Sequence, residues 1–337
     1  MRKLIIFSVF VTAVVTGIFL FVSYQASYSH GFASAEQRFE VRPGDDALSV
    51  GARLEEAGIV SSRFAFVWDL LRENRLHSLV AGEYALSGTL TIPEIAYLLA
   101  EGKVVPKDVK VVFPEGWTVR KMAARLTASG LPGDKFSYLV THPLPEWRDK
   151  FDFLADLPKD ASVEGYLFPD TYLFNPEASG QTIIETMLRT FGKKVDVDLR
   201  KNLAVKQGSL FAAVTLASIV ENEVPTERDR KIVADLFSRR LSTGMPLQSC
   251  ATLQYILGVD KKQYSYDETH TVSPYNTYLN KGLPKGPVGN PGLMSLRAVA
   301  VPEPNPYFYF LSDPKTGETI FSATYDEHVA AKAAHGL

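Results

Sequence analysis

Residues 210–223 read LFAAVTLASIVENE, an apolar run that ends in two carboxylates. The run is apolar all round, which is typical of a helix buried on most sides. A carboxylate in the last turn of such a helix faces the negative end of the helix dipole and loses solvation, and both effects raise its pKa. A raised carboxyl pKa is what a general acid working near neutral pH requires. The stretch therefore predicts a core helix with a candidate acid at its end.

The spacing of the two carboxylates favours Glu221 over Glu223 as that acid. Glu221 shares its helix face with Val214, Ala217 and Ser218, which are small and leave room for a ligand, whereas Glu223 lies above larger apolar residues. The alternative is that both carboxylates are solvated or paired with basic residues of the next helix (Arg228, Arg230 or Lys231).

The segments around this helix predict further helices and one hairpin. Pro225 stops the helix, and Thr226 starts the next one, with Asp229 three residues on, continuing to Leu241. Upstream, residues 164–172 (EGYLFPDTY) predict a turn with packed aromatic rings, and residues 183–191 predict a helix. Downstream, residues 307–312 and 319–322 alternate around a Gly-containing turn, which predicts a hairpin, and a last helix starts at 326.

The region before residue 105 predicts small strand and helix units. Strands are expected at 39–41 and 83–86, and helices at 45–57, from Ser61 or Ser62 to 75, and from 91 to 102. The pattern Ala-Arg-Leu followed by Gly and an aliphatic residue occurs at 52–59 and again at 124–131, each time after a Pro/Gly turn. Two copies do not establish a solenoid, and a genuine related pair is favoured only slightly.

Composition places the chain among ordinary globular proteins and excludes several classes. The 337 residues are 46% apolar and 22% charged, and the formal charge of −2 gives no general reason to expect a nucleic-acid partner. The single cysteine, Cys250, cannot form an internal disulfide. The sequence has neither an HExxH motif nor a Cys/His cluster, so we expect no metal or other cofactor, with an all-carboxylate site left open.

The N-terminus predicts a membrane anchor. Residues 4–22 carry no charge and would cover roughly 28 Å of hydrocarbon as a helix, which is too long for the usual cleaved signal peptide. Arg2 and Lys3 precede the stretch, whereas no Lys or Arg follows it until Arg38, so the positive-inside rule leaves the N-terminus in the cytoplasm. We therefore expect a single-pass protein of the cell (inner) membrane whose body lies outside the cytoplasm.

These observations predict an α+β fold, because strands and helices mix without a regular βαβ succession. The expected parts are the cytoplasmic tip and anchor at 1–23, a stalk at 24–37, a small αβ module at 38–105, a connecting αβ subdomain at 106–160 and a larger mixed domain at 161–337. In the last part, 273–278 (SPYNTY) and the proline-rich 282–292 combine aromatic faces with amide groups, a surface suited to sugars, with ordinary loop packing about equally expected.

Several ordered segments resemble the endolytic murein transglycosylase family, the YceG-like or MltG type. They are FPEGWT at 113–118, EGYLFPDTY at 164–172, ASIVENE at 217–223, RRL at 239–241, GMPLQ at 244–248, SPYNTY at 273–278, GLP at 282–284, NPG at 290–292 and FSATYDEH at 321–328. The resemblance implies a LysM-like module after the anchor and places the catalytic glutamate on Glu221. Cys250-Ala251 departs from the Asp-Pro of many relatives, which puts any role of that Asp in doubt here.

The implied reaction is non-hydrolytic cleavage of peptidoglycan glycan strands between N-acetylmuramic acid and N-acetylglucosamine. One carboxyl serves as acid toward the glycosidic oxygen and then as base toward the muramic acid 6-hydroxyl, which closes a 1,6-anhydro ring. Expected substrate contacts are Gln248, Tyr275 and Asn276. The resemblance further implies termination of glycan elongation near the synthases, with a penicillin-binding protein as a partner.

Two alternatives remain open from the sequence. One is a glycoside hydrolase that uses Glu221 together with Glu223, Glu164 or Asp170. The other is a non-catalytic scaffold whose LysM-like part holds glycan near the synthases.

Overall fold

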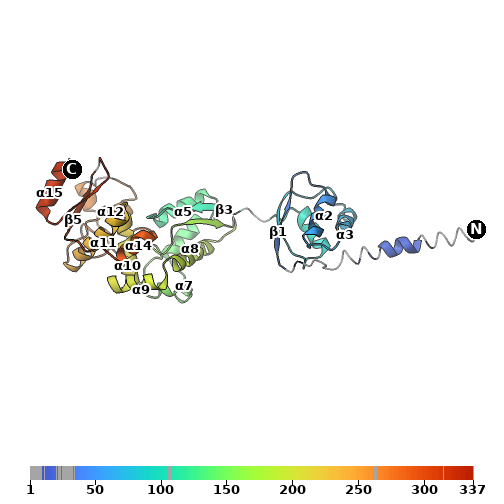
Figure 1. Ribbon diagram of the computed structural model, residues 1–337, viewed down its shortest axis with the longest axis horizontal. Helices are drawn as coiled ribbons and strands as arrows, with labels where there is room; N and C mark the ends of the chain where they lie inside the picture. The colour runs from blue at the N-terminus through green and yellow to red at the C-terminus, as the bar shows by residue number, and fades with distance from the viewer. Residues whose placement is uncertain are drawn as a thin grey trace, which may run out of the picture. The chain divides into compact units, whose positions relative to one another are not determined.

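The computed structural model describes residues 10, 12–19, 21, 24, 33, 35–104, 108–261, 264–313 and 315–336. It divides into two compact units, Met1–Lys107 and Asp108–Leu337. Each described strand belongs to one of three two-stranded antiparallel sheets, β1-β2, β3-β4 and β5-β6, among many helices (Figure 1). The α+β fold predicted from the sequence is confirmed.

The first unit is a strand, two helices, an antiparallel strand and a further helix. Its elements are β1 (Gln37–Val41), α2 (Ala47–Glu56), α3 (Arg63–Arg72), β2 (Gly82–Leu86) and α4 (Ile92–Ala100). The helix starts follow from the sequence, because Ser62 caps α3 and Thr91 forms a capping box with Glu94 at the start of α4. The apolar faces of these elements meet in a core of their own, which includes Leu54, Phe66 and Tyr84.

The second unit begins with a similar order of elements. β3 (Val109–Val112) is followed by α5 (Val119–Ala128) and α6 (Gly133–Thr141), and β4 (Thr171–Phe174) returns antiparallel to β3. Both α2 and α5 are followed by a glycine with positive φ, Gly58 and Gly130, at the matching positions of the two sequence copies. The shared opening of strand, helix, glycine and helix supports a related pair, whereas in the second unit two short helical segments, 146–150 and 152–154, come before the returning strand.

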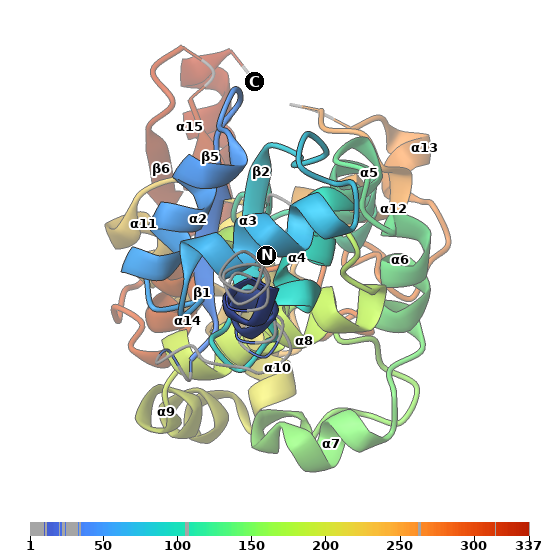
Figure 2. The same ribbon diagram turned by 90° about the vertical axis from the view of Figure 1, so that its right-hand side faces the viewer.

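The remaining elements of the second unit are mostly helical. They are α7 (Glu146–Lys150), the short 3-10 helix η1 (Asp152–Leu154), α8 (Gly180–Lys194), α9 (Val197–Gln207), α10 (Leu210–Glu221), α11 (Glu227–Ser242), α12 (Cys250–Leu257), α13 (Tyr266–Thr269), α14 (Leu293–Ala300), β5 (Tyr309–Ser312), β6 (Thr319–Ser322) and α15 (Tyr325–His335). α10 packs against α9, α11 and α14 (Figure 2). The predicted buried helix, its tight corner with the next helix and the C-terminal hairpin are confirmed.

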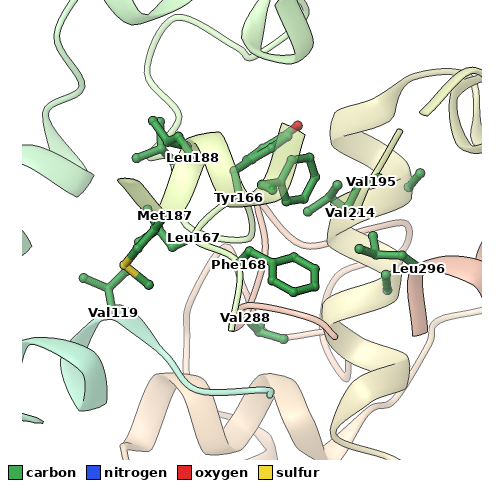
Figure 3. Close-up of a cluster of buried hydrophobic side chains, with 14 of the residues drawn as sticks. Val119, Tyr166, Leu167, Phe168, Met187, Leu188, Val195, Val214, Val288 and Leu296 are labelled. Carbon is green, nitrogen blue, oxygen red and sulfur yellow. The ribbon is translucent and has the colours of Figure 1, made fainter. Parts of the chain in front are cut away.

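One continuous core fills the second unit. Figure 3 shows Tyr166, Leu167 and Phe168 of the aromatic loop among side chains from α8, α10 and α14. Nine residues of α10 are buried, from Leu210 to Val220, as its uniform apolarity predicts. The expected division into a connecting subdomain at 106–160 and a separate domain at 161–337 is therefore not observed, because β3 pairs with β4 across that boundary and both segments share this core.

The predicted membrane span at 4–22 lies partly outside the described residues. Of that stretch, residues 10, 12–19 and 21 are described and helical, and Phe10, Ile18 and Phe21 are among its exposed apolar side chains. In the described part of the chain no single helix has the length and apolarity needed to cross a membrane, and only α9 and α10 together, bent by 89°, pass on length and composition.

Candidate active site

Glu221 is held at the end of α10 by two charge-assisted hydrogen bonds. Its Oε1 accepts from Nη2 of Arg230 at 2.8 Å, and its Oε2 accepts from the Gly292 N–H at 2.8 Å. The side chains of Glu221 and Arg230 are 4% and 7% exposed, so the ion pair is buried. Val214, Ala217 and Ser218, which were expected to leave room for a ligand, are fully buried in the core of the part of the chain that the structure describes. Glu221 thus pairs with Arg230 of the next helix, which is the alternative that the sequence left open.

Arg230 closes the corner between α10 and α11. Its Nε donates to the Val224 carbonyl at 3.1 Å, and its Nη2 reaches Glu221. The third nitrogen, Nη1, is buried and has no hydrogen-bond acceptor among the described residues. A buried N–H group without an acceptor costs free energy, so a further hydrogen-bond acceptor would bind at Nη1 of Arg230.

Asn290 joins three of the family segments. Its Oδ1 accepts from the buried N–H groups of Gly165 and Leu167 at 2.8 and 3.1 Å, and its Nδ2 donates to the Trp117 carbonyl at 2.9 Å. Its own carbonyl accepts from the Gly116 N–H at 2.8 Å. The segments FPEGWT, EGYLFPDTY and NPG, which lie far apart in the sequence, therefore meet at one buried amide beside the end of α10.

Glu115 brings a second carboxyl to Glu221. Gly116, with φ of +75°, has no Cβ, and a methyl group there would lie 3.3 Å from Cγ of Glu221 and 2.9 Å from Oδ1 of Asn222. Glu115 itself is exposed and packs onto Gly292, the residue whose N–H donates to Glu221. Partial burial of the Glu115 carboxyl and the neighbouring Glu221 raise its pKa, while Arg230 opposes the rise.

Glu164 is buried and Glu223 is half-buried, each at another place in the unit. Ser249 donates to Glu223, and burial raises the pKa of this carboxyl. Glu164 accepts from the Val119 N–H at 2.8 Å and from the Tyr255 hydroxyl at 2.7 Å, and burial raises its pKa to about 7. The raised carboxyl pKa that the sequence predicts at the helix corner is thus found on Glu223. Asp170, the other carboxylate considered, pairs with Lys194 at 3.6 Å.

Two cavities lie next to these residues. The smaller, of ≈160 Å³, is bordered by Gly116 and Asn222, next to Glu115 and Glu221, and the larger, of ≈700 Å³, runs along α5 and α6 to Glu164. Thr118, Arg120 and Tyr255 line both. The larger volume is within the range of ligand sites. A further cavity of ≈500 Å³ belongs to the first unit and is lined by residues of β1 and β2 and by Pro43 and Ala81.

The structure assigns different positions to the three expected substrate contacts. Gln248 is exposed with φ of +50°, and Tyr275 is half-buried with its ring 4.8 Å from that of Tyr255, a lining residue of both cavities. Asn276 is fully buried, and its amide donates to the carbonyls of Thr269 and Thr271. The expectation of a direct substrate contact is therefore wrong for Asn276, because its donors stabilise its own loop.

Sequence reasoning missed Glu115, Asn290 and Tyr255 as members of this site. Glu115 and Asn290 each stand inside a quoted family segment, but no periodicity joins positions so far apart. Among the described residues no group of three or more His, Cys, Asp or Glu side chains could hold a metal ion.

The profile of the YceG-like family matches residues 39–334, a range that includes every residue of the site. The chain belongs to the YceG-like family. An endolytic murein transglycosylase of Bacillus subtilis is 29% identical over 308 residues, covering 86% of this chain and 82% of the relative. A protein of the same name from Streptococcus pneumoniae is 29% identical over 321 residues, covering 87% of this chain and 57% of the relative.

A YceG-like protein of Listeria monocytogenes of known crystal structure has the same fold. It is 31% identical, its TM-score is 0.59, and the match covers 89% of this chain and 100% of that one. The YceG-like assignment that the quoted segments predict is therefore confirmed by sequence and by structure.

Proposed function

We propose that this YceG-like chain is an endolytic transglycosylase of peptidoglycan, a lyase in which Glu221 is the catalytic acid and base. The observation that carries the proposal is the convergence of distant family segments on one carboxyl. Gly292 and Arg230 hold it, Glu115 lies beside it, and Asn290 fixes the loops around it. Like the relatives named endolytic murein transglycosylase, the chain acts within glycan strands.

The chemistry needs one proton that leaves Glu221 and returns to it. The protonated carboxyl donates to the glycosidic oxygen between N-acetylmuramic acid and N-acetylglucosamine as an oxocarbenium-like centre forms. The resulting carboxylate takes the proton of the muramic acid 6-hydroxyl, whose oxygen closes the 1,6-anhydro ring. No water is consumed. The buried pair with Arg230 stabilises the carboxylate form, so the base step fits the observed contacts directly, whereas the acid step requires Glu221 to take up a proton beside Arg230.

The two cavities supply room for the glycan, and the smaller one reaches Asn222, the residue that follows Glu221. Tyr255 and Thr118 border both, so a strand that crosses from the larger to the smaller cavity passes an aromatic face and a hydroxyl before it reaches Asn222, next to Glu221. Aromatic faces beside hydrogen-bonding groups suit pyranose rings. Gln248 and Tyr275 remain proposed contacts of this strand.

The rest of the proposal concerns location and partners. The apolar helical residues around 12–19 expose large side chains, as a membrane anchor would, and we place the body outside the cytoplasm at the cell (inner) membrane. The strand, helix, helix and strand order of the first unit supports a LysM-like glycan-binding role. At this place the enzyme would meet nascent strands, terminate their elongation and work beside a penicillin-binding protein.

A hydrolase is the second candidate, and the specific observation that favours it is the second carboxyl, Glu115. Hydrolases require one carboxylate to act on the sugar or to activate water and another to act as acid. The observed neighbour of Glu221 is Glu115 and not Glu223, Glu164 or Asp170, each of which has other partners.

Product analysis separates the candidates. The full-length chain in detergent, Glu221→Gln and a matched control, Glu177→Gln on the exposed surface, are incubated with uncross-linked glycan, and the ends are determined by mass spectrometry. We expect 1,6-anhydro ends from the wild type and the control and none from Glu221→Gln, since the amide cannot donate the proton. Reducing ends would identify a hydrolase, and binding of sacculi without fragment release would identify a scaffold.

A further inference from the structure

The second carboxyl beside Glu221, that of Glu115, has no assigned role, and Arg230 acts on it electrostatically. Glu221 occupies Nη2 of Arg230, while Nη1 is buried without an acceptor among the described residues. Arg230 is 6% exposed, so its charge is compensated by neighbouring carboxylates rather than by solvent. The groups that act electrostatically on Glu115 are Glu221, from the end of α10, and Arg230, from the first turn of α11.

The acid step creates a charge problem that one carboxylate alone does not solve. When Glu221 becomes neutral, Arg230 loses its only hydrogen-bonded carboxylate partner among the described residues. An uncompensated buried cation disfavours that protonation strongly. A second carboxylate near Arg230 removes this obstacle, because it supplies the counter-charge while Glu221 carries the proton.

We propose that Glu115 is this counter-charge, a positioning residue that shares Arg230 with Glu221 and thereby allows Glu221 to be protonated at neutral pH. The inference rests on the proposed function, in which Glu221 must donate a proton. The two carboxyls and the guanidinium then form a cluster that binds one proton. When Glu221 carries the proton, Arg230 pairs with the Glu115 carboxylate, and when Glu221 is ionised, Arg230 pairs with Glu221. Partial burial and Glu221 raise the pKa of Glu115, as expected for two carboxyls that compete for one cation.

The glycine at position 292 supports a close approach of Glu115 to the peptide group that binds Glu221. Its φ of −78° and ψ of 172° are accessible to any residue, so the backbone gives no reason for glycine here. A methyl group at this position would instead overlap the Glu115 carboxylate. Glycine at 292 therefore allows Glu115 to lie against the same peptide whose N–H donates to Glu221.

Two variants test the role of Glu115 by different routes. Glu115→Gln removes the charge and keeps the size, and Gly292→Ala displaces the Glu115 carboxyl without changing any charge. Because Glu115 is exposed and Gly292 has ordinary backbone angles, both variants are expected to fold. Glu177→Gln, which alters an exposed glutamate outside the site, is the matched control.

The measurement is the pH dependence of kcat/KM for the full-length chain in detergent on uncross-linked glycan. Loss of a neighbouring negative charge favours ionisation of the remaining carboxyl, so the alkaline limb should move to lower pH by about one unit in Glu115→Gln. Gly292→Ala should move in the same direction, and Glu177→Gln should not move. A Glu115→Gln enzyme with an unmoved alkaline limb, whether its rate is unchanged or lowered equally at every pH, would overturn the proposal.

A second readout keeps the proposal testable if the enzyme proves to be a hydrolase or inactive. Infrared pH titration of the protonated-carboxyl band follows the cluster without turnover, and the component that Glu221→Gln removes reports the cluster's proton. Glu115→Gln should shift that component to lower pH. If Glu115→Gln leaves it in place, the proposal is wrong whatever the products are, whereas a shifted component without anhydro products would refute only the proposed reaction.

Discussion

Replacement of Asn290 by alanine should be among the most damaging single changes in the second unit. The Asn290 side chain is fully buried and accepts hydrogen bonds from two buried backbone donors, the N–H groups of Gly165 and Leu167. Alanine keeps the backbone bonds at 290 but leaves both donors without a partner. The Trp117 carbonyl, in contrast, still accepts from the N–H of residue 290.

The magnitude follows from these two orphaned donors. A buried backbone N–H that loses its acceptor costs about 1–3 kcal/mol, so the pair costs about 2–6 kcal/mol of unfolding free energy. A typical domain has only about 5–15 kcal/mol in total. The matched control is Asn175→Ala, which removes an exposed acceptor of the Glu177 N–H and should cost less than about 1 kcal/mol.

Urea unfolding of the full-length chain, followed by tryptophan fluorescence, measures the difference. Trp147 is fully buried in the core of the second unit and reports on its unfolding. Hydrogen exchange of peptides that span 164–168 should be faster in Asn290→Ala and unchanged in Asn175→Ala. If Asn290→Ala unfolds within 1 kcal/mol of Asn175→Ala, or if exchange at 164–168 stays at the wild-type rate, the argument from orphaned donors is wrong.

Three further predictions concern charged groups. Burial raises the pKa of Glu164 from 4.5 to about 7, so the protonated Glu164 side chain stabilises the folded state below pH 4.5, and this stabilisation is lost as the pH rises through 7. In urea unfolding between these pH values, the stability of Glu164→Gln should therefore rise by about 3 kcal/mol relative to that of the wild type. Burial opposes ionisation of Glu185, but hydrogen bonds from Lys150, Gln181 and Trp147 lower its pKa to about 2. Glu185→Gln should therefore lower the free energy of unfolding by about 1–3 kcal/mol at neutral pH, and this difference from the wild type should disappear as the pH falls from 4.5 to 2. Removal of the guanidinium in Arg230→Met should destabilise the protein by about 3–5 kcal/mol in urea unfolding, because it leaves the buried Glu221 carboxylate without its cation; a loss below 1 kcal/mol would contradict this.

Local signals in the sequence predicted most of the helix starts. Ser62, Thr91 and Thr226 each accept a hydrogen bond from the backbone N–H three residues on, as a helix N-cap does. The uniform apolarity of 210–220 correctly predicted a buried helix. Helices such as α9 and α14 were not predicted, because α9 has only one buried residue and α14 is a short segment next to the proline-rich loop.

Of the residues in the candidate site, the local sequence pattern predicted only Glu221. Glu221 could be found because its burial conflicts with its charge at a helix end, a conflict that is visible in a few consecutive residues. The partner Arg230 lies nine positions on, across a corner whose geometry decides which of three bases faces the acid. Glu115 and Asn290 meet Glu221 through tertiary packing, and a pattern of periods or caps contains no information about such contacts.

The environment of Glu221 also shows why burial alone is a poor guide to a catalytic acid. The C-terminal end of α10 and burial both favour the neutral carboxyl, whereas the Gly292 N–H and Arg230 favour the carboxylate. Glu115 interacts electrostatically with both Glu221 and Arg230 and adds a further charge to these contacts. A carboxyl that must give up a proton and take one back in a single turnover needs such a balance, since stabilising either form strongly would slow the opposite step. The displacement of the alkaline limb in Glu115→Gln measures that balance directly, because a merely structural glutamate would lower the rate without moving the limb.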